Sequence, residues 1–340
     1  MLARPTMKDV AQYAGVSAMT VSRVVNGEPG VNPETAARVQ RAIRRLGYQR
    51  DDVARQLRRK GQLTQTIGLL VDNVADPFMA SLASAAEDVA RRHGSVVLIG
   101  SSRDDLRRER EVVSAFTARR VDGLILIPVS GSHRFLRNAM ATGTRVVCAD
   151  RSATGLESDT VVIDNRGSAE AAIAHLIAHG HRHIAYLGDR LDIWTIEERY
   201  AGYRAALEAA GIPEDPAIVR HGLRLPQDAA QAVTAMLDAA DPPTAVLASN
   251  GIVGLGVRAA LPARVALVSF DDFLLAAQLD PPVTVIAQDP VAIGATAAHL
   301  LFSRIHGDDS PPRTVVLPTR LIARGSGEVP GPHLPAAPPV

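Results

Sequence analysis

Apolar and polar residues at the start of the chain follow the spacing of two short helices separated by a sharp turn. In MKDVAQYAGVSAMTVSRVVNG, residues 7–27, small or apolar residues recur on one face of each helix: Val10, Ala11 and Ala14, then Val16, Val21 and Val24. Gly15 lies between the helices, where a sharp turn needs the left-handed backbone that glycine adopts most easily. The pattern predicts a helix-turn-helix, a motif that places its second helix in the major groove of duplex DNA.

Capping residues stand at the ends of both helices. The Ser17 hydroxyl can accept a hydrogen bond from a free backbone N–H of the second helix, and Asn26-Gly27 suits the end of that helix. Thr6 and Asp9 form a weaker cap on the first helix. The alternative is an ordinary pair of core helices, in which caps, turn glycine and apolar stripe need not coincide.

The outward face of the second helix is predicted to contact DNA. Arg23 is the only charged residue on this face, and we expect it to form a bidentate contact with guanine. Ala18 and Met19 suit the methyl group of thymine instead. With the capping residues, the predicted DNA-contacting set is Thr6, Ser17, Ala18, Met19, Thr20, Ser22, Arg23 and Asn26.

A third helix is predicted from the Asn32 cap and Pro33 to a stop at Gly47. Its core face comprises Ala36, Val39, Ile43 and Leu46. Its arginines point outward, where they can meet phosphates or simply face solvent. The next segment, DDVARQLRRKGQLTQT, is too short for an independently stable helix and stands where a linker to a new domain is expected.

From Gln65 onward, short apolar runs alternate with longer amphipathic stretches. The first series of runs is TIGLLV, SVVLIG, DGLILIP and RVVCAD, with helices beginning near Pro77, Asp104 and Ser132. The second is HIAYLG, AIVRHG, TAVLAS and RVALVSF, with helices near Arg166, Ile196, Pro226 and Gly251. VTVIAQ, a helix from Asp289 to about Ile305, and TVVLP complete the pattern. Such alternation predicts βαβ units and two parallel sheets.

Composition adds a charge asymmetry to this picture. Residues 1–60 hold 12 Lys and Arg against 5 Asp and Glu, although the 340-residue chain has a formal net charge of only +1. A basic head on an acidic body suits phosphate binding by one end of the protein. The single cysteine, Cys148, excludes an internal disulfide, and the N-terminus has no apolar signal core, so a cytoplasmic protein without a membrane segment is expected.

The stretch KDVAQYAGVSAMTVSRVVNG, followed by VNPETAARVQRAIRRLGYQ, closely resembles the start of lac repressor family proteins, and the resemblance continues to about Ser326. It implies a small all-α helix-turn-helix head, 1–49, a hinge or linker, 50–64, and an α/β periplasmic-binding-protein-like body of two doubly wound parallel-sheet subdomains, 65–326. Three chain crossings would divide the body into an N-subdomain, about 65–163 and 289–317, and a C-subdomain, about 164–288 and 318–326. The proline-rich residues 327–340 are expected to be disordered.

The resemblance also implies a hinge helix whose Leu57, beside Ala54, inserts into the minor groove. A plain flexible linker is the alternative. Relatives usually carry Pro-Asn before this helix, whereas Asp51 and Asp52 stand here and would repel a nearby phosphate. A homodimer reading a near-palindromic DNA operator is expected, because half-sites mirror the two-fold axis of the protein.

The resemblance further assigns ligand contacts, listed as Phe78, Asp150, Arg199, Asn250, Asp271 and Gln288. Trp194 precedes Arg199 by five residues and either stacks on the ligand or packs in the core. Gly251 replaces the aspartate that usually follows the asparagine, so Asn250 can be positioned differently. A small effector between the lobes is expected to control DNA affinity. Arginine and aspartate facing one cavity can hold vicinal hydroxyls as well as a purine edge, and a sugar is favoured over a purine.

Two other classes of protein were weighed against a DNA-binding regulator, most naturally a repressor. A solute-binding transport protein would share the body but would carry a secretory signal and no basic head. An α/β enzyme would need catalytic residues, yet NGIVGLG fits neither a dinucleotide loop nor a P-loop, and Asp271-Asp272 point apart on a strand end. His175, His179, His181 and His183 lack the glutamate and cysteines of common zinc sites, so neither metal nor cofactor is expected.

Overall fold

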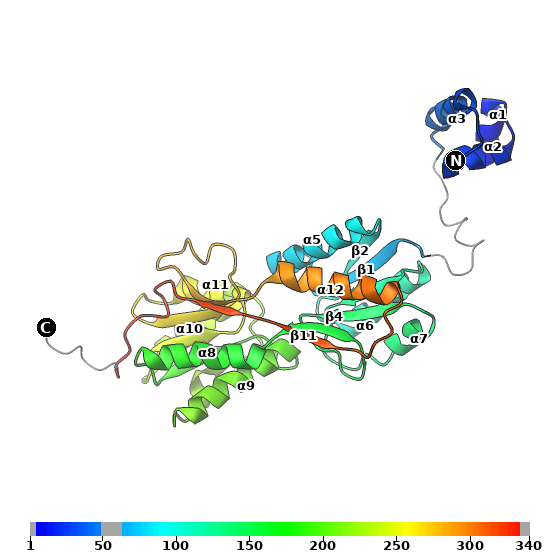
Figure 1. Cartoon of the computed structure of the whole chain (residues 1–340). Helices are drawn as coiled ribbons and strands as arrows, with labels where there is room; N and C mark the ends of the chain where they lie inside the picture. The colour runs from blue at the N-terminus through cyan, green and yellow to red at the C-terminus, as the bar shows by residue number, and fades with distance from the viewer. Residues whose placement is uncertain (1–4, 49–62, 334–340) are drawn as a thin grey trace. The chain divides into compact units, whose positions relative to one another are not determined.

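The computed structural model describes residues 5–48 and 63–333, and the chain divides into two compact units, residues 1–63 and 64–340. The first unit, the head, contains α1 (Met7–Ala14), α2 (Ala18–Asn26) and α3 (Pro33–Leu46). Thr6 and Asp9 form a reciprocal capping box, the Ser17 hydroxyl accepts from the N–H of Thr20 at 3.1 Å, and Gly15 is left-handed with φ 62°. The helix-turn-helix prediction is confirmed (Figure 1).

The core of the head is smaller than the apolar pattern predicts. Val10, Val21 and Val39 are fully buried, whereas Val16 and Val24 are only half-buried. On α3, the buried partner of Val39 is Ala42, which the pattern did not single out. Three short helices enclose few side chains completely, because surface is large relative to volume in so small a unit. Ala54 and Leu57 lie outside the described residues.

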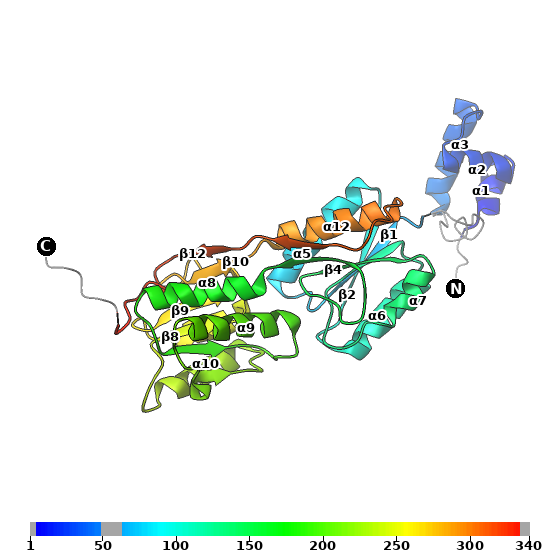
Figure 2. The ribbon, with the colours of Figure 1, turned by 60° about the horizontal axis from the view of Figure 1, so that its bottom comes forward.

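The second unit, the body, contains two sheets with helices on both faces (Figures 1 and 2). The N-lobe sheet has the order β11-β5-β4-β3-β1-β2, and every neighbouring pair is parallel. Its strands are β1 (Thr66–Val71), β2 (Val96–Ser101), β3 (Gly123–Leu126), β4 (Arg145–Ala149), β5 (Asp159–Ile163) and β11 (Thr314–Leu317). Its helices are α5 (Pro77–Arg92), α6 (Leu106–Ala118), α7 (Leu136–Ala141) and α12 (Pro290–Ile305).

The C-lobe sheet has the order β12-β10-β9-β8-β6-β7, parallel except for β12, which runs antiparallel to β10. Its strands are β6 (Ile184–Leu187), β7 (Val219–Arg220), β8 (Ala245–Ala248), β9 (Ala266–Phe270), β10 (Thr284–Ala287) and β12 (Arg320–Ile322). Its helices are α8 (Asn165–Ala178), α9 (Trp194–Ala209), the 3₁₀ turn η1 (Pro216–Ile218), α10 (Pro226–Leu237) and α11 (Gly251–Ala260). Each lobe places its second strand outside its first, so both have the same winding.

The chain passes between the lobes three times: after β5, after β10 and after β11. At one crossing the hydroxyls of Ser168 and Thr319 are 2.7 Å apart. In the N-lobe, Arg304 on α12 forms two hydrogen bonds, at 2.6 and 2.9 Å, with Asp159 at the start of β5. Both side chains are almost completely buried, so this ion pair ties the returning helix to the sheet.

Two strands were not predicted by the pattern of apolar runs. β5 is short and begins with polar residues, Asp159 and Thr160, and β12 has three residues, of which the first is exposed Arg320. Both strands occupy places at or beside a sheet edge. In such strands the alternation of apolar and polar residues is too brief to identify them from sequence.

The expectation of disorder from residue 327 is wrong for 327–333, which pack on the C-lobe. The Glu328 carboxylate bonds the Thr284 hydroxyl at 2.8 Å, and the Val329 carbonyl lies 2.8 Å from Nε2 of His181. Gly331 donates to the carbonyl of His179 at 2.7 Å, and a side chain at Gly331 would collide with the backbone of Gly180. A proline-rich chain forms few hydrogen bonds of its own, and here Thr284 of β10 and the residues after α8 supply specific hydrogen bonds to it.

The clustered histidines of the C-lobe have structural partners. His175 bonds Glu328 at 2.5 Å, and Nδ1 of His181 lies 3.0 Å from the Thr244 hydroxyl. His183 faces Asp215 at 3.3 Å. These histidines therefore hold the C-terminal segment and a loop of the C-lobe in place. Among the helices of the described ranges, none combines the length and apolar character required to cross a membrane.

Candidate functional site

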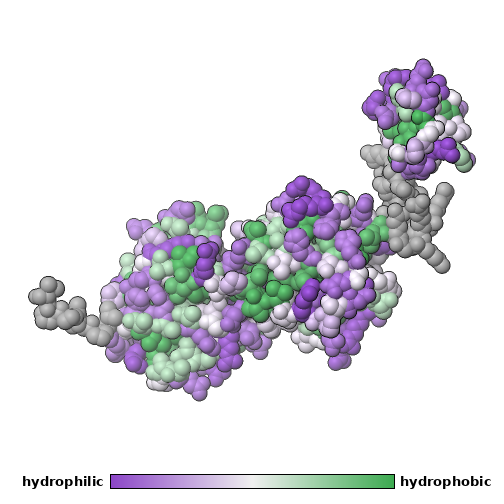
Figure 3. All heavy atoms as spheres, in the orientation of Figure 1, coloured by the Kyte–Doolittle hydropathy of each residue, from purple (hydrophilic) through white to green (hydrophobic). Residues whose placement is uncertain are grey.

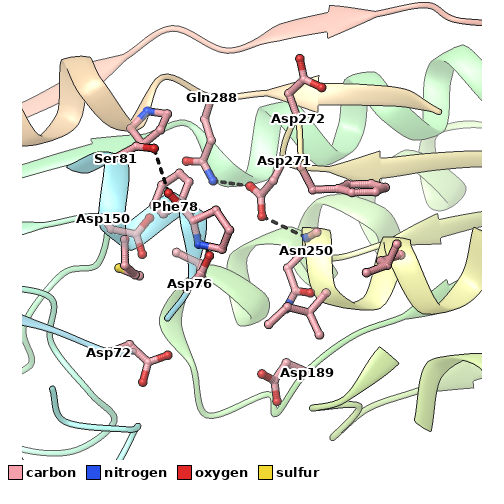
Figure 4. A pocket seen from close by; sticks show the side chains of 18 of the residues that line it. Asp72, Asp76, Phe78, Ser81, Asp150, Asp189, Asn250, Asp271, Asp272 and Gln288 are labelled. Atoms are coloured by element: carbon pink, nitrogen blue, oxygen red, sulfur yellow. Dashed lines mark hydrogen bonds between the residues drawn. The ribbon is translucent and has the colours of Figure 1, made fainter. Parts of the chain in front are cut away.

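A cavity of about 570 Å³ lies between the two lobes of the body, at the carboxyl ends of their strands. Its walls come from loops that follow six strands and from the starts of α5, α9, α11 and α12. From the N-lobe the polar lining residues are Asp72, Asp76, Ser81, Asp150 and Arg151; from the C-lobe they are Asp189, Thr195, Arg199, Asn250, Asp271, Asp272 and Gln288. Figure 4 labels ten of the lining residues, from both lobes, around this space.

An aspartate with a left-handed backbone stands at the cavity in each lobe. Asp150, after β4, has φ 64°, and Asp271, after β9, has φ 67°. Aspartate tolerates this conformation better than most residues, but it still costs roughly 1–3 kcal/mol. Strain of this kind concentrates at binding sites, because it aims a side chain that relaxed backbone would direct elsewhere.

Arg199 on α9 is 3% exposed and held rigidly. Its Nε donates to Oδ1 of Asn165 at 2.8 Å, Nη1 donates to the carbonyl of Ser249 at 2.6 Å, and the guanidinium lies 4.1 Å from the centre of the Phe270 ring. Within the described ranges, Nη2 has no such bond. A fixed arginine whose Nη2 group is unused is suited to orienting a ligand that carries hydroxyls.

A short hydrogen-bond network joins the ends of β8, β9 and β10. Gln288 donates to Asp271 at 2.5 Å, and the N–H of Gly251 donates to the other Asp271 oxygen at 3.1 Å (Figure 4). Asn250 caps α11 by accepting from Val253 at 2.9 Å, which leaves its amide nitrogen for the cavity. A Cβ on Gly251 would lie 2.8 Å from Cβ of Phe273, so the absence of a side chain there makes room for that phenylalanine.

All six effector residues assigned by the resemblance line the cavity: Phe78, Asp150, Arg199, Asn250, Asp271 and Gln288. Trp194, for which stacking on the ligand and packing in the core were both left open, is a correction to the expected effector set: it is absent from the lining and half-buried. Thr195, Ile196 and Arg199 occupy the cavity face of α9. Trp194 is the first residue of α9 and is not among the residues on that face.

Sequence reasoning missed several carboxylates of the cavity. Asp72 and Asp76 follow β1, and Asp189 follows β6. Each follows an apolar run or precedes a helix. Its position at the end of a predicted strand was therefore the feature of the sequence that could have identified it as a cavity residue. An apolar wall was missed as well, and its members are Ile193, Pro226, Ile252, Leu255, Phe273, Leu274, Leu275 and Pro290.

The electrostatics of the cavity are dominated by these carboxylates. Burial raises the pKa of Asp76 to about 6; its hydrogen bond from Phe78 opposes the shift, while Asp271, Asp150 and Asp72 add to it. Burial also raises the pKa values of Asp72, Asp150 and Asp189 above their ordinary range. Negative charge is therefore incompletely compensated in this cavity.

Two contacts cross from lobe to lobe beside the cavity. Asp104 of the N-lobe pairs with Arg151 of the same lobe and with Arg224 of the C-lobe, at 2.8 Å in each case. The Ser130 hydroxyl donates to the carbonyl of Asp192. These contacts are polar and few, so they can break when the lobes move apart.

The head presents the residues predicted for DNA on its surface. Met19 is 68% exposed, and Ser17, Ala18 and Arg23 are exposed as well. Thr20, Ser22 and Asn26 are half-buried, and Thr6 is exposed while capping α1. Three arginines, Arg38, Arg41 and Arg45, surround a shallow hollow beside Tyr13, which adds positive charge to the head.

Two family models match the chain. Residues 6–51 match the description "Bacterial regulatory proteins, lacI family", and residues 173–327 match "Periplasmic binding protein-like domain". Among curated relatives, the HTH-type transcriptional repressor CytR of Escherichia coli is 31% identical over 94% of this chain and 96% of its own length. The HTH-type transcriptional regulator CelR of Thermobifida fusca is 33% identical over 95% and 98%.

Solved structures agree with these relatives. A lac repressor dimer bound to operator and the anti-inducer ONPF matches with a TM-score of 0.82 and 28% identity, over 96% of this chain and 99% of that one. A CelR–cellobiose complex matches with a TM-score of 0.70 and 32% identity, over 95% and 100%. The relatives are regulators rather than enzymes. With a helix-turn-helix head and a two-lobed body enclosing a polar cavity, the chain belongs to the lacI family of DNA-binding transcription regulators, whose action is controlled by an effector.

Proposed function

We propose that this regulator is a repressor that binds a near-palindromic operator as a homodimer, and that a sugar or sugar derivative in the cavity sets its operator affinity. The cavity is the observation that supports the proposal most strongly. Polar side chains from both lobes line it, and the same chain has a DNA-binding head. A regulator must reach the DNA that it binds, and this requirement supports the expected cytoplasmic location.

On the DNA side, α2 is the proposed reading helix. Exposed Arg23 would form the bidentate contact with guanine, and Ala18 and Met19 would meet a thymine methyl group. Thr20 and Ser22 are short enough to bond phosphates or base edges. Ser17 and Asn26 stand at the two ends of α2, and Thr6 caps α1; these three residues complete the proposed set of DNA contacts. Ala54 and Leu57 remain proposed minor-groove contacts.

On the effector side, the cavity combines carboxylate acceptors, the unused Nη2 group of Arg199 and an apolar wall, and this combination favours a sugar. Carboxylates accept from vicinal hydroxyls, and the apolar face of a pyranose packs on residues such as Phe78 or Phe273. The bound cellobiose and ONPF of the solved relatives support this class of ligand. Six aspartates line the cavity against two arginines, and this excess of acceptors favours a ligand rich in hydroxyl donors over a purine.

Control of DNA binding would follow from the position of the ligand between lobes. A ligand that contacts Asp150 on one lobe and Asp271 on the other binds best when the lobes are close together. If the operator favours a different lobe arrangement, ligand and DNA oppose each other by one coupling free energy. Inducer and corepressor behaviour differ only in the sign of that coupling.

A homodimer is supported by exposed apolar surface on the body. The edge strand β2 carries Val96 and Ile99, which are 64% and 50% exposed. Apolar residues also gather in continuous patches on the face of the body drawn in Figure 3. Contiguous patches of this kind typically mark protein interfaces, and the solved lac repressor is a dimer.

A paired experiment tests the proposal. Thermal-shift screening of sugars and purines on the full chain should find a sugar that raises the melting temperature, because a ligand of the native state stabilises it. The Asp271→Ala variant should bind operator normally and ignore that sugar, whereas exposed Asp88→Ala on α5 should respond like wild type. A response retained in full by Asp271→Ala would place the sensor outside this cavity.

A further inference from the structure

Acidic side chains outnumber basic ones in the wall of the cavity. Six aspartates line it, namely Asp72, Asp76, Asp150, Asp189, Asp271 and Asp272, against two arginines, Arg151 and Arg199. Asp272 is neutralised outside the cavity by two hydrogen bonds from Arg324, at 2.6 and 2.7 Å. The remaining five aspartates share the two arginines and distant Arg224.

Both arginines are held by other groups of the protein, and of the two only Arg199 keeps an unused Nη2 group. Arg151 donates to Asp104 at 2.8 Å and lies 3.5 Å from Asp150 and 3.8 Å from Asp72. Arg199 is fixed by Asn165, by the Ser249 carbonyl and by the Phe270 ring. Neither arginine forms an ion pair with Asp76 or Asp271.

Asp76 and Asp271 face the cavity from opposite lobes without a cationic partner. Asp76 accepts a hydrogen bond from the N–H of Phe78 at 2.9 Å, and Asp271 accepts from Gly251 and Gln288. In residues 5–48 and 63–333, no basic side chain lies within ion-pairing distance of either carboxylate. The two negative charges repel each other across the cavity, and the buried Oε1 of neighbouring Gln288 also lacks a hydrogen-bond donor within those ranges.

We propose that the effector carries a protonated amine that binds between Asp76 and Asp271, beside hydroxyls that reach Asp150 and Arg199. This inference rests on the proposed function and narrows its ligand to a cationic sugar derivative such as an amino sugar. An ammonium group donates three hydrogen bonds and supplies the missing charge, whereas a neutral hydroxyl supplies only a hydrogen bond. A phosphorylated sugar would add negative charge to a site that already has too much.

The placement also gives the amine a role in closing the lobes. Bringing Asp76 towards Asp271 is electrostatically unfavourable while the cavity holds only water. An ammonium ion between them converts this repulsion into two attractions that span both lobes. The charge of the ligand, and not only its shape, would thus favour the closed arrangement.

Matched ligands test the charge directly. Thermal shift and calorimetry on the full chain at pH 7 would compare glucosamine, galactosamine and chitosan disaccharide with their N-acetylated forms and with glucose, galactose and cellobiose. The expected result is that at least one amine binds about 10- to 100-fold more tightly than its two neutral counterparts, the range for a charge-assisted hydrogen bond. Magnesium and calcium chloride alone should produce no shift.

Variants then place the amine. Asp76→Asn keeps the shape and helix-capping ability of the side chain, and it should abolish the preference for the amine over its N-acetylated form. Asp88→Asn, on the exposed side of the same helix, should retain the preference. Asp271→Asn provides a second removal of charge from the other lobe if the first variant is unstable.

The outcomes separate this inference from the proposed function. Binding of neutral sugars with no preference for amines would overturn the inference and leave the proposed function standing. If none of the sugars bound, the result would count against both the inference and the proposed function. A preference for amines that survives in both Asp76→Asn and Asp271→Asn, or a shift by a divalent cation alone, would overturn the placement between these carboxylates.

Discussion

The head and the body recognise their ligands with side chains in opposite environments. In the head, Arg23 and Met19 are exposed on α2, while Val10, Val21 and Val39 form the core beneath them. In the body, Arg199 and Asp150 are buried, and the hydrogen bonds that orient Arg199 also join α9 to α8 and to the end of β8. For Arg23 and Met19 in the head, recognition is thus separate from stability, whereas for Arg199 in the body the two are shared.

This difference decides how substitutions should behave. A change on the exposed face of α2 should alter DNA binding without unfolding the head. A change in the body should affect ligand binding and stability together, except where a conservative replacement keeps the hydrogen bonds. Four predictions test this contrast.

The largest effect is expected from removing the head. A fragment beginning at Thr64 contains the whole second unit, so it should fold and retain the thermal shift with the effector. Specific operator binding should be lost completely, as measured by fluorescence anisotropy at moderate salt, because α2 supplies the base contacts. If this fragment still bound the operator specifically, the assignment of DNA recognition to the head would be wrong.

The next effect concerns the stability of the body. Asp159→Ala leaves Arg304 buried without its ion-pair partner, and the free energy of unfolding should fall by roughly 3–5 kcal/mol. Urea denaturation of the fragment from Thr64 would measure this. Asp309, which pairs with Arg145 on the surface, is a matched control whose replacement by Ala should cost at most about 1 kcal/mol.

A single exposed residue of the head should carry sequence discrimination. Arg23→Ala should lose roughly 1–3 kcal/mol of binding free energy at one operator position, with the melting temperature unchanged. Arg38→Ala, on α3, should weaken binding about equally for all sequences. Equal losses across all operator positions for Arg23→Ala would reassign it to the phosphate backbone.

The smallest effect is a stabilisation by removing a buried charge. The pKa of Asp76 is raised to about 6 in the folded protein, so the unfolded state holds its proton less tightly. The protonated Asp76 therefore contributes to the free energy of unfolding at low pH, and this contribution is lost as the pH rises through 6. At pH 7.5, Asp76→Asn should be more stable than wild type by roughly 1–2 kcal/mol, and the difference should vanish near pH 4. A less stable variant at pH 7.5 would show that its charge is compensated.

The sequence predicted the head more completely than the body, for a physical reason. Helix caps such as Ser17 and Gly15 act within four residues, so their pattern is legible in a single stretch. The cavity combines strand ends that lie up to 216 residues apart, from Asp72 to Gln288. Periodicity identified most strands, whereas the three crossings and the ligand residues came from the resemblance.

The misses have the same origin. Asp76 is visible in the sequence as one more helix cap, and only the facing lobe makes its charge notable. Trp194 lies five residues before Arg199, but its direction depends on where α9 begins. The ordering of residues 327–333 depends on hydrogen bonds to His181 and Thr284, which composition does not reveal.

The measurement that tests the account most directly is an operator titration with and without a saturating effector, in wild type and in Asp271→Ala. The account predicts two separated binding curves for wild type and a single coincident curve for the variant, with equal affinities of the two proteins for operator alone. An effector that binds the wild-type body by calorimetry but leaves its operator affinity unchanged would contradict the claim that this cavity controls DNA binding.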